Sequence, residues 1–274
     1  MAGSFFSNLE ERARKIDSLL CVGLDPHPED LPQPSAQAAY SYCLRVIEAT
    51  ADLALAFKPN AAFFEIHGQS GWEALRRVIA AVPPEIPVIL DAKRGDIASS
   101  ARAYARAIFE GLGAAAMTAN PYLGGDALEP LIEDPQRGVF LLCKTSNPGA
   151  GDLQDLTIGA GEQAGLQVYE AVARLAQGWN RNGNLGLVVG ATHPEALRRV
   201  RALAPNLWFL APGIGAQGGD LQQALHAGLR SDGLGLLVNA SRSIARAGDP
   251  LQAARNLVDQ INAARHTHSA EDRS

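Results

Sequence analysis

Four charged residues follow a short apolar run in the first third of the chain. The run 88–90 (Val-Ile-Leu) reads as a buried strand, and the next six residues include Asp91, Lys93, Arg94 and Asp96. Side chains alternate in direction along an extended backbone, so we expect Asp91 and Lys93 to lie side by side at the strand's end. An ammonium group held by a carboxylate is a fixed cation and a proton donor. A surface salt bridge is the simpler interpretation, and the rest of the chain has to decide between the two.

A glycine separates this pair from a second aspartate. Gly95 lets the chain turn, and Asp96 falls near the start of a predicted helix that begins at Ile97. The apolar run before the pair and the turn after it both weaken the interpretation as a plain surface bridge.

The composition limits the classes of protein to which the chain can belong. With 274 residues, 47% of them hydrophobic and 19% charged, it can bury a substantial core in one large domain or two small ones. A net charge of −5 argues against general binding to nucleic acid or anionic membranes, although it allows a local basic pocket for a phosphate. No apolar run approaches the ~20 residues that span a bilayer.

The ends and the cysteines indicate a cytoplasmic protein. Met1–Lys15 shows no basic segment followed by a long apolar region, so no secretory signal is visible. Cys21 and Cys143 lie in apolar runs and no CxxC pair occurs, so we expect reduced, buried thiols. We expect a reducing cytoplasm, with flexible termini at 1–8 and 264–274.

Short apolar runs alternate with stretches of helical spacing along the chain. Eight runs are predicted strands: Leu19–Leu24, Leu53–Phe57, Val88–Leu90, Ala114–Thr118, Val139–Cys143, Leu185–Val189, Leu207–Leu210 and Gly235–Val238. The predicted helices are 36–50, 71–81, 97–112, 165–178, 194–204 and 220–227. This alternation predicts a parallel (β/α)8 barrel, formed as a single catalytic domain over 1–274. An open, doubly wound sheet is the alternative, less favoured because no Gly-x-Gly-x-x-Gly follows the first run.

Polar residues gather where the predicted strands end. They are Asp25, Lys58 and Asn60, Asp91 and Lys93, Thr118 and Asn120, 144–147, 212–215, and 239–242. The carboxyl ends of the strands in such a barrel share one rim, where barrel enzymes place their chemistry. We therefore expect a single site at that rim.

The loops after the last two predicted strands are typical of a phosphate site. The first contains Gly213, Gly215, Gly218 and Gly219, and the second contains Ser241-Arg242-Ser243-Ile244. Glycines leave backbone N–H groups open to an anion, and these loops are the usual phosphate site of the barrel. Gln217, between the glycines, could reach over the phosphate. Turn glycines and a solvated arginine are the simpler interpretation of each part alone.

Two further features are less informative. The six histidines show no metal-ligand spacing, and no nucleophile elbow is present. The connection Ser146–Asn184 is longer than most, and is either a loop that orders over a ligand or a plain surface insertion.

Three segments together resemble a known family. They are Asp91-x-Lys93-x-x-Asp96-Ile97, Asp25 in Gly-Leu-Asp, and Lys58 in Phe-Lys-Pro-Asn. These are similar to the orotidine 5'-phosphate decarboxylases over Val22–Arg242, and to the longer bacterial branch, type 2, in particular. The resemblance implies conversion of orotidine 5'-phosphate to UMP and CO2 in de novo pyrimidine biosynthesis, with neither a metal nor an organic cofactor.

The resemblance also implies roles for the site residues. Lys93 would protonate C6 as the general acid, Asp91 would hold it beside the departing carboxylate, and Lys58 would complete an alternating lysine and aspartate array. Asp96 would reach the neighbouring subunit's site, which implies a homodimer. The implied substrate contacts are Asp25 with the ribose, Ser146 with the pyrimidine, and Gln217, Arg242, Gly213 and Gly215 with the phosphate. The family commonly has glycine at the position of Ser241, so the role of that residue is open.

Two other functions remain as alternatives. A sugar-phosphate decarboxylase or aldolase of the same superfamily shares the Asp-x-Lys-x-x-Asp motif but holds an enediolate on a divalent metal, for which Glu65 is the candidate ligand. A nucleotide-binding or regulatory barrel without catalysis is disfavoured, because a binding module has no need of the Asp91–Lys93 pair.

Overall fold

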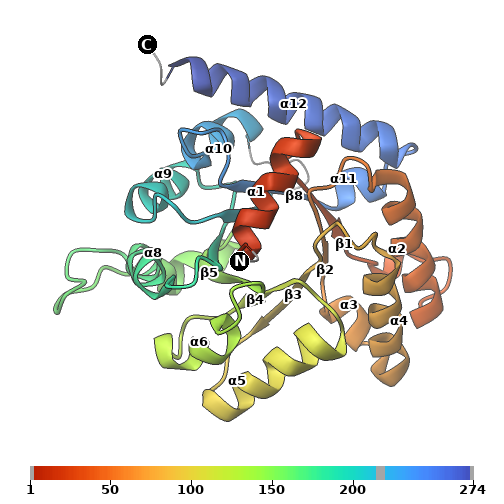
Figure 1. The fold of residues 1–274 in the computed structure, drawn as a ribbon, viewed down its shortest axis with the longest axis horizontal. Coiled ribbons are helices and arrows are strands. Elements are labelled where there is room, and N and C mark those ends of the chain that lie inside the picture. The colour runs from red at the N-terminus through yellow and green to blue at the C-terminus, as the bar shows by residue number, and fades with distance from the viewer. Residues whose placement is uncertain (1–2, 214–219, 272–274) are drawn as a thin grey trace.

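Eight parallel strands form the centre of the computed structural model, which describes residues 3–213 and 220–271. The strands are β1 Leu20–Leu24, β2 Ala56–Pro59, β3 Ile89–Arg94, β4 Ala116–Ala119, β5 Gly138–Lys144, β6 Leu185–Val189, β7 Phe209–Pro212 and β8 Leu236–Ala240. Their hydrogen-bonded order is β2-β1-β8-β7-β6-β5-β4-β3, and the bridges Phe57–Val88 and Asn60–Asp91 join β2 to β3. The sheet therefore closes into the predicted (β/α)8 barrel, with helices around it (Figure 1).

The helices follow the strands in the alternating order expected. They are α1 Phe5–Ile16, α2 Ala36–Thr50, α3 Ala62–Glu65, α4 Gly68–Ala81, α5 Ala98–Ala105, α6 Gly125–Ile132, α7 Gly151–Gln154, α8 Val168–Trp179, α9 Pro194–Leu203, α10 Leu221–Gly228, α11 Arg242–Ala245 and α12 Pro250–Glu271. The helix predicted over 97–112 is divided, because a π-helical turn over Arg106–Gly111 follows α5. No helix in the described part of the chain is long and apolar enough to cross a membrane.

Helix α1 covers the amino-terminal end of the barrel, so the structure differs here from the expected flexible terminus (Figure 1). Phe5 and Phe6 are 4% and 6% exposed, and the Phe6 ring lies 5.3 Å from that of Phe140 in β5. Gly138 leaves room for this packing, since a Cβ there would lie 2.4 Å from Phe5 Cδ1. Burial of an aromatic ring contributes about 2 kcal/mol, which anchors the start of the chain. Flexibility at 264–274 stays a prediction.

Apolar side chains fill the barrel and the layer beneath its helices. Phe57, Phe140, Trp208 and Phe209 have at most 1% of their surface exposed. All three cysteines are buried and free, as expected for Cys21 and Cys143, and burial raises the pKa of the Cys21 thiol to about 12. The buried residues Lys58, Thr118 and Asn239, in contrast, lie at or near the carboxyl ends of the strands.

The end of β3 departs from a regular strand. Its register against β4 shifts between Leu90 and Arg94, and Lys93 has a φ of 50°. A left-handed backbone costs a residue with a Cβ about 1–2 kcal/mol, so the surroundings must hold Lys93 in this conformation. Gly95 has no positive φ; a Cβ there would lie 3.1 Å from the carbonyl oxygen of Asn120. The turn expected at Gly95 is therefore made at Lys93, and Gly95 serves close packing instead.

Candidate active site

Two lysines converge on one aspartate at the mouth of the barrel. Lys58, at the end of β2, donates from Nζ to Asp91 Oδ2 at 2.9 Å, and Lys93 donates from Nζ to Asp91 Oδ1 at 2.6 Å. The Lys58 and Asp91 side chains are 5% and 13% exposed, whereas that of Lys93 is 48% exposed. The sequence prediction that Asp91 and Lys93 meet is confirmed, although the bulge and the left-handed Lys93 bring them together rather than a regular strand.

The array keeps its charges despite its burial. Burial disfavours the ammonium form of Lys58, but Asp91 and Asp25 outweigh it and raise the pKa of Lys58 above its ordinary value. Burial likewise disfavours the carboxylate of Asp91, and Lys58 and Lys93 outweigh it, so the pKa of Asp91 lies well below its ordinary range. The site therefore presents a fixed carboxylate between two cations.

Thr118, in β4, supports the same carboxylate. Its hydroxyl group donates to Asp91 Oδ1 at 2.9 Å and accepts from the backbone N–H groups of Ala92 at 3.0 Å and Lys93 at 2.9 Å. The Thr118 side chain is buried, with 1% of the residue exposed. The sequence analysis predicted that Thr118 lies at the rim but did not predict a role for it. Its position at the end of an apolar run was the only sequence feature that pointed to the site.

Two cavities meet at this array, where they share Lys58, Asp91 and Pro212. The polar lobe, about 280 Å³, is also lined by Asp25, His27, Asn60, Phe63, Gly213, Asn239, Ser241, Arg242 and Ser243. The inner lobe, about 420 Å³, is also lined by Lys93, Thr118, Leu142, Thr145, Ser146, Asn147, Gln154, Val188 and Leu210. An elongated ligand with a polar end and a flat, partly apolar end therefore fits across the lysine and aspartate array.

The polar lobe contains the predicted ribose and phosphate residues that the structure describes. Asp25 lines it, and its Oδ1 is buried without a hydrogen-bond partner among the described residues. Arg242 lines it from the start of α11, and Gly213 has a φ of 101°, which favours glycine. Gly215 and Gln217 lie outside the described residues.

Ser241 directly precedes Arg242, at the position where the resemblance noted from the sequence implies a glycine. Its Oγ is buried with no hydrogen-bond partner in the described part of the chain. The side chain packs onto β1: a Cβ at Gly23 would lie 2.6 Å from Ser241 Cβ. The serine is therefore accommodated because the neighbouring strand carries a glycine.

The connection after β5 reaches the inner lobe. The Gln154 side chain accepts from Thr145 N–H at 2.9 Å and donates to Thr145 Oγ1 at 2.8 Å. The buried Lys144 binds Asp155 Oδ1 at 2.6 Å. Ser146 lines the lobe and packs on Gly190, where a Cβ would lie 3.1 Å from that of Ser146. These contacts hold the start of the connection against the cavity, and the choice between a ligand-covering loop and a surface insertion stays a prediction.

Asp96 is the one predicted catalytic residue that lines neither lobe. Its Oδ1 accepts from Ile97 N–H at 2.8 Å, just before α5. Ile97 itself is 63% exposed. The position of Asp96 is therefore outside its own subunit's cavity, and its role in a partner's site stays a prediction.

Glu65 is engaged by an ion pair with Arg94. The Arg94 guanidinium also lies 5.4 Å from the centre of the Tyr104 ring. Within residues 3–213 and 220–271, no three His, Cys, Asp or Glu side chains are grouped so that they could hold a metal ion. Glu65, the candidate metal ligand of the sugar-phosphate decarboxylase or aldolase alternative, is thus paired with Arg94.

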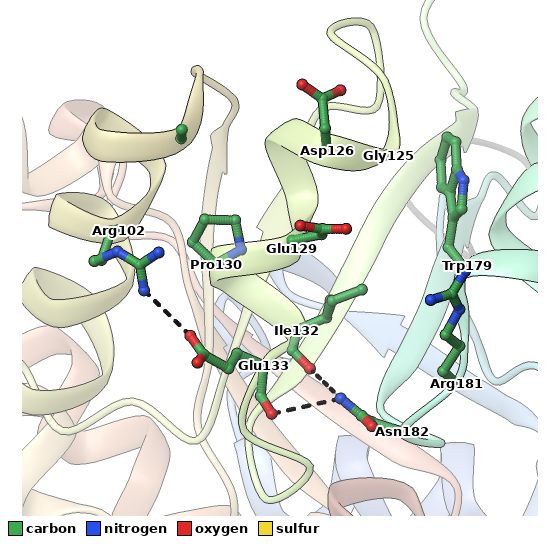
Figure 2. A pocket seen from close by; sticks show the side chains of 11 residues that line it. Arg102, Gly125, Asp126, Glu129, Pro130, Ile132, Glu133, Trp179, Arg181 and Asn182 are labelled. Carbon is green, nitrogen blue, oxygen red and sulfur yellow. Dashed lines mark hydrogen bonds and ion pairs between the residues drawn. The ribbon is translucent and has the colours of Figure 1, made fainter.

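A further cavity of about 680 Å³ lies outside the barrel, between α5, α6 and the end of α8 (Figure 2). Its Arg102 faces Glu133 at 3.2 Å, and the Asn182 side chain donates to the carbonyl oxygens of Ile132 and Glu133 (Figure 2). It shares no residue with either lobe. Because the lysine and aspartate array does not line this cavity, we assign the chemistry to the barrel mouth.

Comparisons with known proteins identify the family of this chain. A model described as the orotidine 5'-phosphate decarboxylase / HUMPS family matches residues 18–257. The orotidine 5'-phosphate decarboxylase of Roseiflexus castenholzii is 50% identical over 272 residues, 95% of this chain and 98% of that protein. The structure of Leishmania donovani OMP decarboxylase has a TM-score of 0.87 at 56% identity, covering 96% of this chain and 99% of that one. The structure of Leishmania donovani UMP synthase has a TM-score of 0.89 at 57% identity. The match covers 96% of this chain but only 57% of the UMP synthase chain. The chain belongs to the orotidine 5'-phosphate decarboxylase / HUMPS family.

Proposed function

We propose that this protein decarboxylates orotidine 5'-phosphate to UMP and CO2, the reaction of de novo pyrimidine biosynthesis, in the cytoplasm. The observation that carries the proposal is the Lys58–Asp91–Lys93 array, which lies where the polar and inner lobes meet. A nucleotide placed across both lobes has its phosphate near Arg242 and its base beside Lys93.

Lys93 acts as the general acid. When the bond from C6 to the carboxylate breaks, its electron pair stays on C6, where resonance gives little relief. The Lys93 ammonium stabilises this localised charge and then transfers a proton to C6, after which the neutral amine takes a proton from water. The side chain is half exposed, which allows that second transfer.

Asp91 holds Lys93 and faces the substrate carboxylate. Two like charges ~4 Å apart repel by about 4 kcal/mol at an effective dielectric constant of 20, and the repulsion disappears when CO2 leaves. The lowered pKa of Asp91 keeps it ionised, so it cannot escape the repulsion by taking a proton. Lys58 balances the Asp91 charge from the opposite side.

The remaining substrate contacts follow the two lobes. Asp25 accepts a hydrogen bond from a ribose hydroxyl, and Arg242 with Gln217 and the backbone of Gly213 and Gly215 binds the phosphate. Ser146 binds the pyrimidine in the inner lobe. Binding of the remote phosphate contributes to closure over the ring, so that fixed groups rather than water surround the developing charge.

The protein acts as a homodimer in which Asp96 completes the partner's site. Exposed apolar side chains follow three consecutive strands on one side of the barrel mouth: Ile66 after β2, Ile97 after β3, and Tyr122 with Leu123 after β4. They are between 47% and 79% exposed. Such a group supports an interface, and Asp96, which precedes Ile97 in the chain, lines neither lobe of its own cavity.

The absorbance of orotidine 5'-phosphate measures the reaction directly. The purified protein should consume the substrate with and without a chelator, and Lys93→Ala should abolish turnover while UMP still binds. Lys15→Ala, on the exposed surface of α1, is the matched control and should retain full activity. Loss of turnover on chelation would favour the sugar-phosphate alternative, absence of turnover with UMP binding retained would favour a binding barrel, and normal turnover of Lys93→Ala would refute the mechanism.

A further inference from the structure

We propose that Thr118 is a positioning residue for the decarboxylation: its hydroxyl group orients the Asp91 carboxylate and holds the left-handed backbone of Lys93, so that the Lys93 ammonium is aimed at C6. The inference rests on the proposed function. Three hydrogen bonds carry it, to Asp91 Oδ1 and from the N–H groups of Ala92 and Lys93.

The hydrogen-bonding capacity of the hydroxyl group determines the direction of each bond. A threonine hydroxyl has one proton and two lone pairs. The two backbone N–H groups can only donate hydrogen bonds, so each of them bonds to one lone pair of the hydroxyl oxygen. The ionised Asp91 carboxylate can only accept a hydrogen bond, so the hydroxyl group donates its one proton in the hydrogen bond to Asp91. The hydroxyl group is thus fully used, in a residue that is 1% exposed to water.

The β3 bulge explains why a side chain is needed. In a regular parallel ladder, the N–H groups of Ala92 and Lys93 would bond to backbone carbonyls, but the register of β3 on β4 shifts between Leu90 and Arg94. Thr118 supplies the missing acceptor for both groups. It thereby holds Lys93 at its φ of 50°.

The same atom links this backbone to the reacting group. Asp91 Oδ1 receives both Thr118 and the Lys93 ammonium, so the hydroxyl group sets the position of the oxygen that holds the ammonium. The Lys93 side chain is 48% exposed and would otherwise be free to move toward water. A displacement of about 1 Å costs a reacting group roughly a hundredfold in rate.

The test compares variants with and without the hydroxyl group. Thr118→Val keeps the shape, and should lower kcat about 10- to 100-fold while the Kd for UMP changes less than about threefold. Thr118→Ser, which keeps the hydroxyl group, should restore kcat to within about threefold of the unsubstituted protein. Thr50→Val is the matched control: Thr50 is equally buried and donates to Val46 O at 2.7 Å in α2, far from the site.

Several outcomes would overturn the proposal. These are an unchanged kcat in Thr118→Val, equal impairment of Thr118→Ser and Thr118→Val, or the same loss of kcat in Thr50→Val. If the valine variant does not fold, Thr118→Ala against Thr118→Ser makes the same comparison, since both lack the methyl group. The proposed function fails separately, because then the unsubstituted protein would itself not consume orotidine 5'-phosphate.

Discussion

Lys58 and Asp91, from neighbouring strands of the barrel, form a nearly buried ion pair with 2.9 Å between Nζ and Oδ2. Removal of one partner of such a pair leaves an uncompensated charge, which costs more than the pair itself contributes. A substitution of either residue is therefore expected to lower both the stability of the barrel mouth and the activity.

Asp91→Asn should abolish turnover and lower the free energy of unfolding by about 3 kcal/mol at pH 7, because Lys58 and Lys93 lose their shared carboxylate. The pKa of Asp91 is lower in the folded protein than its unfolded value of about 3.9. Its contribution is therefore fully present above that value and is lost as the pH falls through the lower, folded pKa. Urea unfolding at pH 7 and at about pH 3 should show a smaller difference between the two proteins in acid. Asp52→Asn, on an exposed aspartate, is the control; an Asp91→Asn difference that grows in acid would contradict the assignment.

Arg242→Ala should raise the KM for orotidine 5'-phosphate by about a hundredfold, because a charge-assisted contact to the phosphate is lost. Binding of uridine, which lacks the phosphate, should be unchanged, so a titration with UMP and uridine separates the two parts of the ligand. Arg174→Ala, on the exposed face of α8, should leave both constants unchanged. An unaltered KM in Arg242→Ala would remove Arg242 from the phosphate site.

Asp96→Asn and Lys93→Ala should each be inactive alone and recover activity when mixed. In a hybrid dimer one site receives both substitutions and the other receives neither. Random exchange of equal amounts makes about half of the dimers hybrids, each with one intact site of two, so about a quarter of normal activity should return. The assay is turnover after subunit exchange, with each variant incubated alone as the control. No recovery, in a mixture shown to exchange subunits, would place Asp96 outside a shared site.

Gly23→Ala should destabilise the protein and weaken phosphate binding, because the new Cβ would lie 2.6 Å from Ser241 Cβ. Ser241→Gly in the same chain should relieve the contact and restore much of the loss. A double-mutant cycle on the thermal midpoint and on the Kd for UMP measures the coupling. Additive effects of the two substitutions would show that the positions act independently.

The eight strands were predictable because each is a short apolar run between turn residues, which is a local signal. The predicted runs end up to four residues before the observed strands: β3 continues to Arg94, β8 to Ala240, and β7 to Pro212. Polar residues such as Asn239 were read as loop because their side chains face the rim and not the core. Helix α1 was missed for the opposite reason, since the partners that bury Phe5 and Phe6 lie more than a hundred residues away.

By itself, the sequence determined the barrel, the rim and the residue types of the array, because alternating apolar runs and the polar residues after them are written in consecutive positions. Only the tertiary structure decided how the array is held. The bulge in β3, the left-handed Lys93 and the three bonds of Thr118 depend on a hydroxyl group 26 residues away from Ala92 in the chain. Such a contact has no local pattern, because it exists only once two strands have paired with a shifted register.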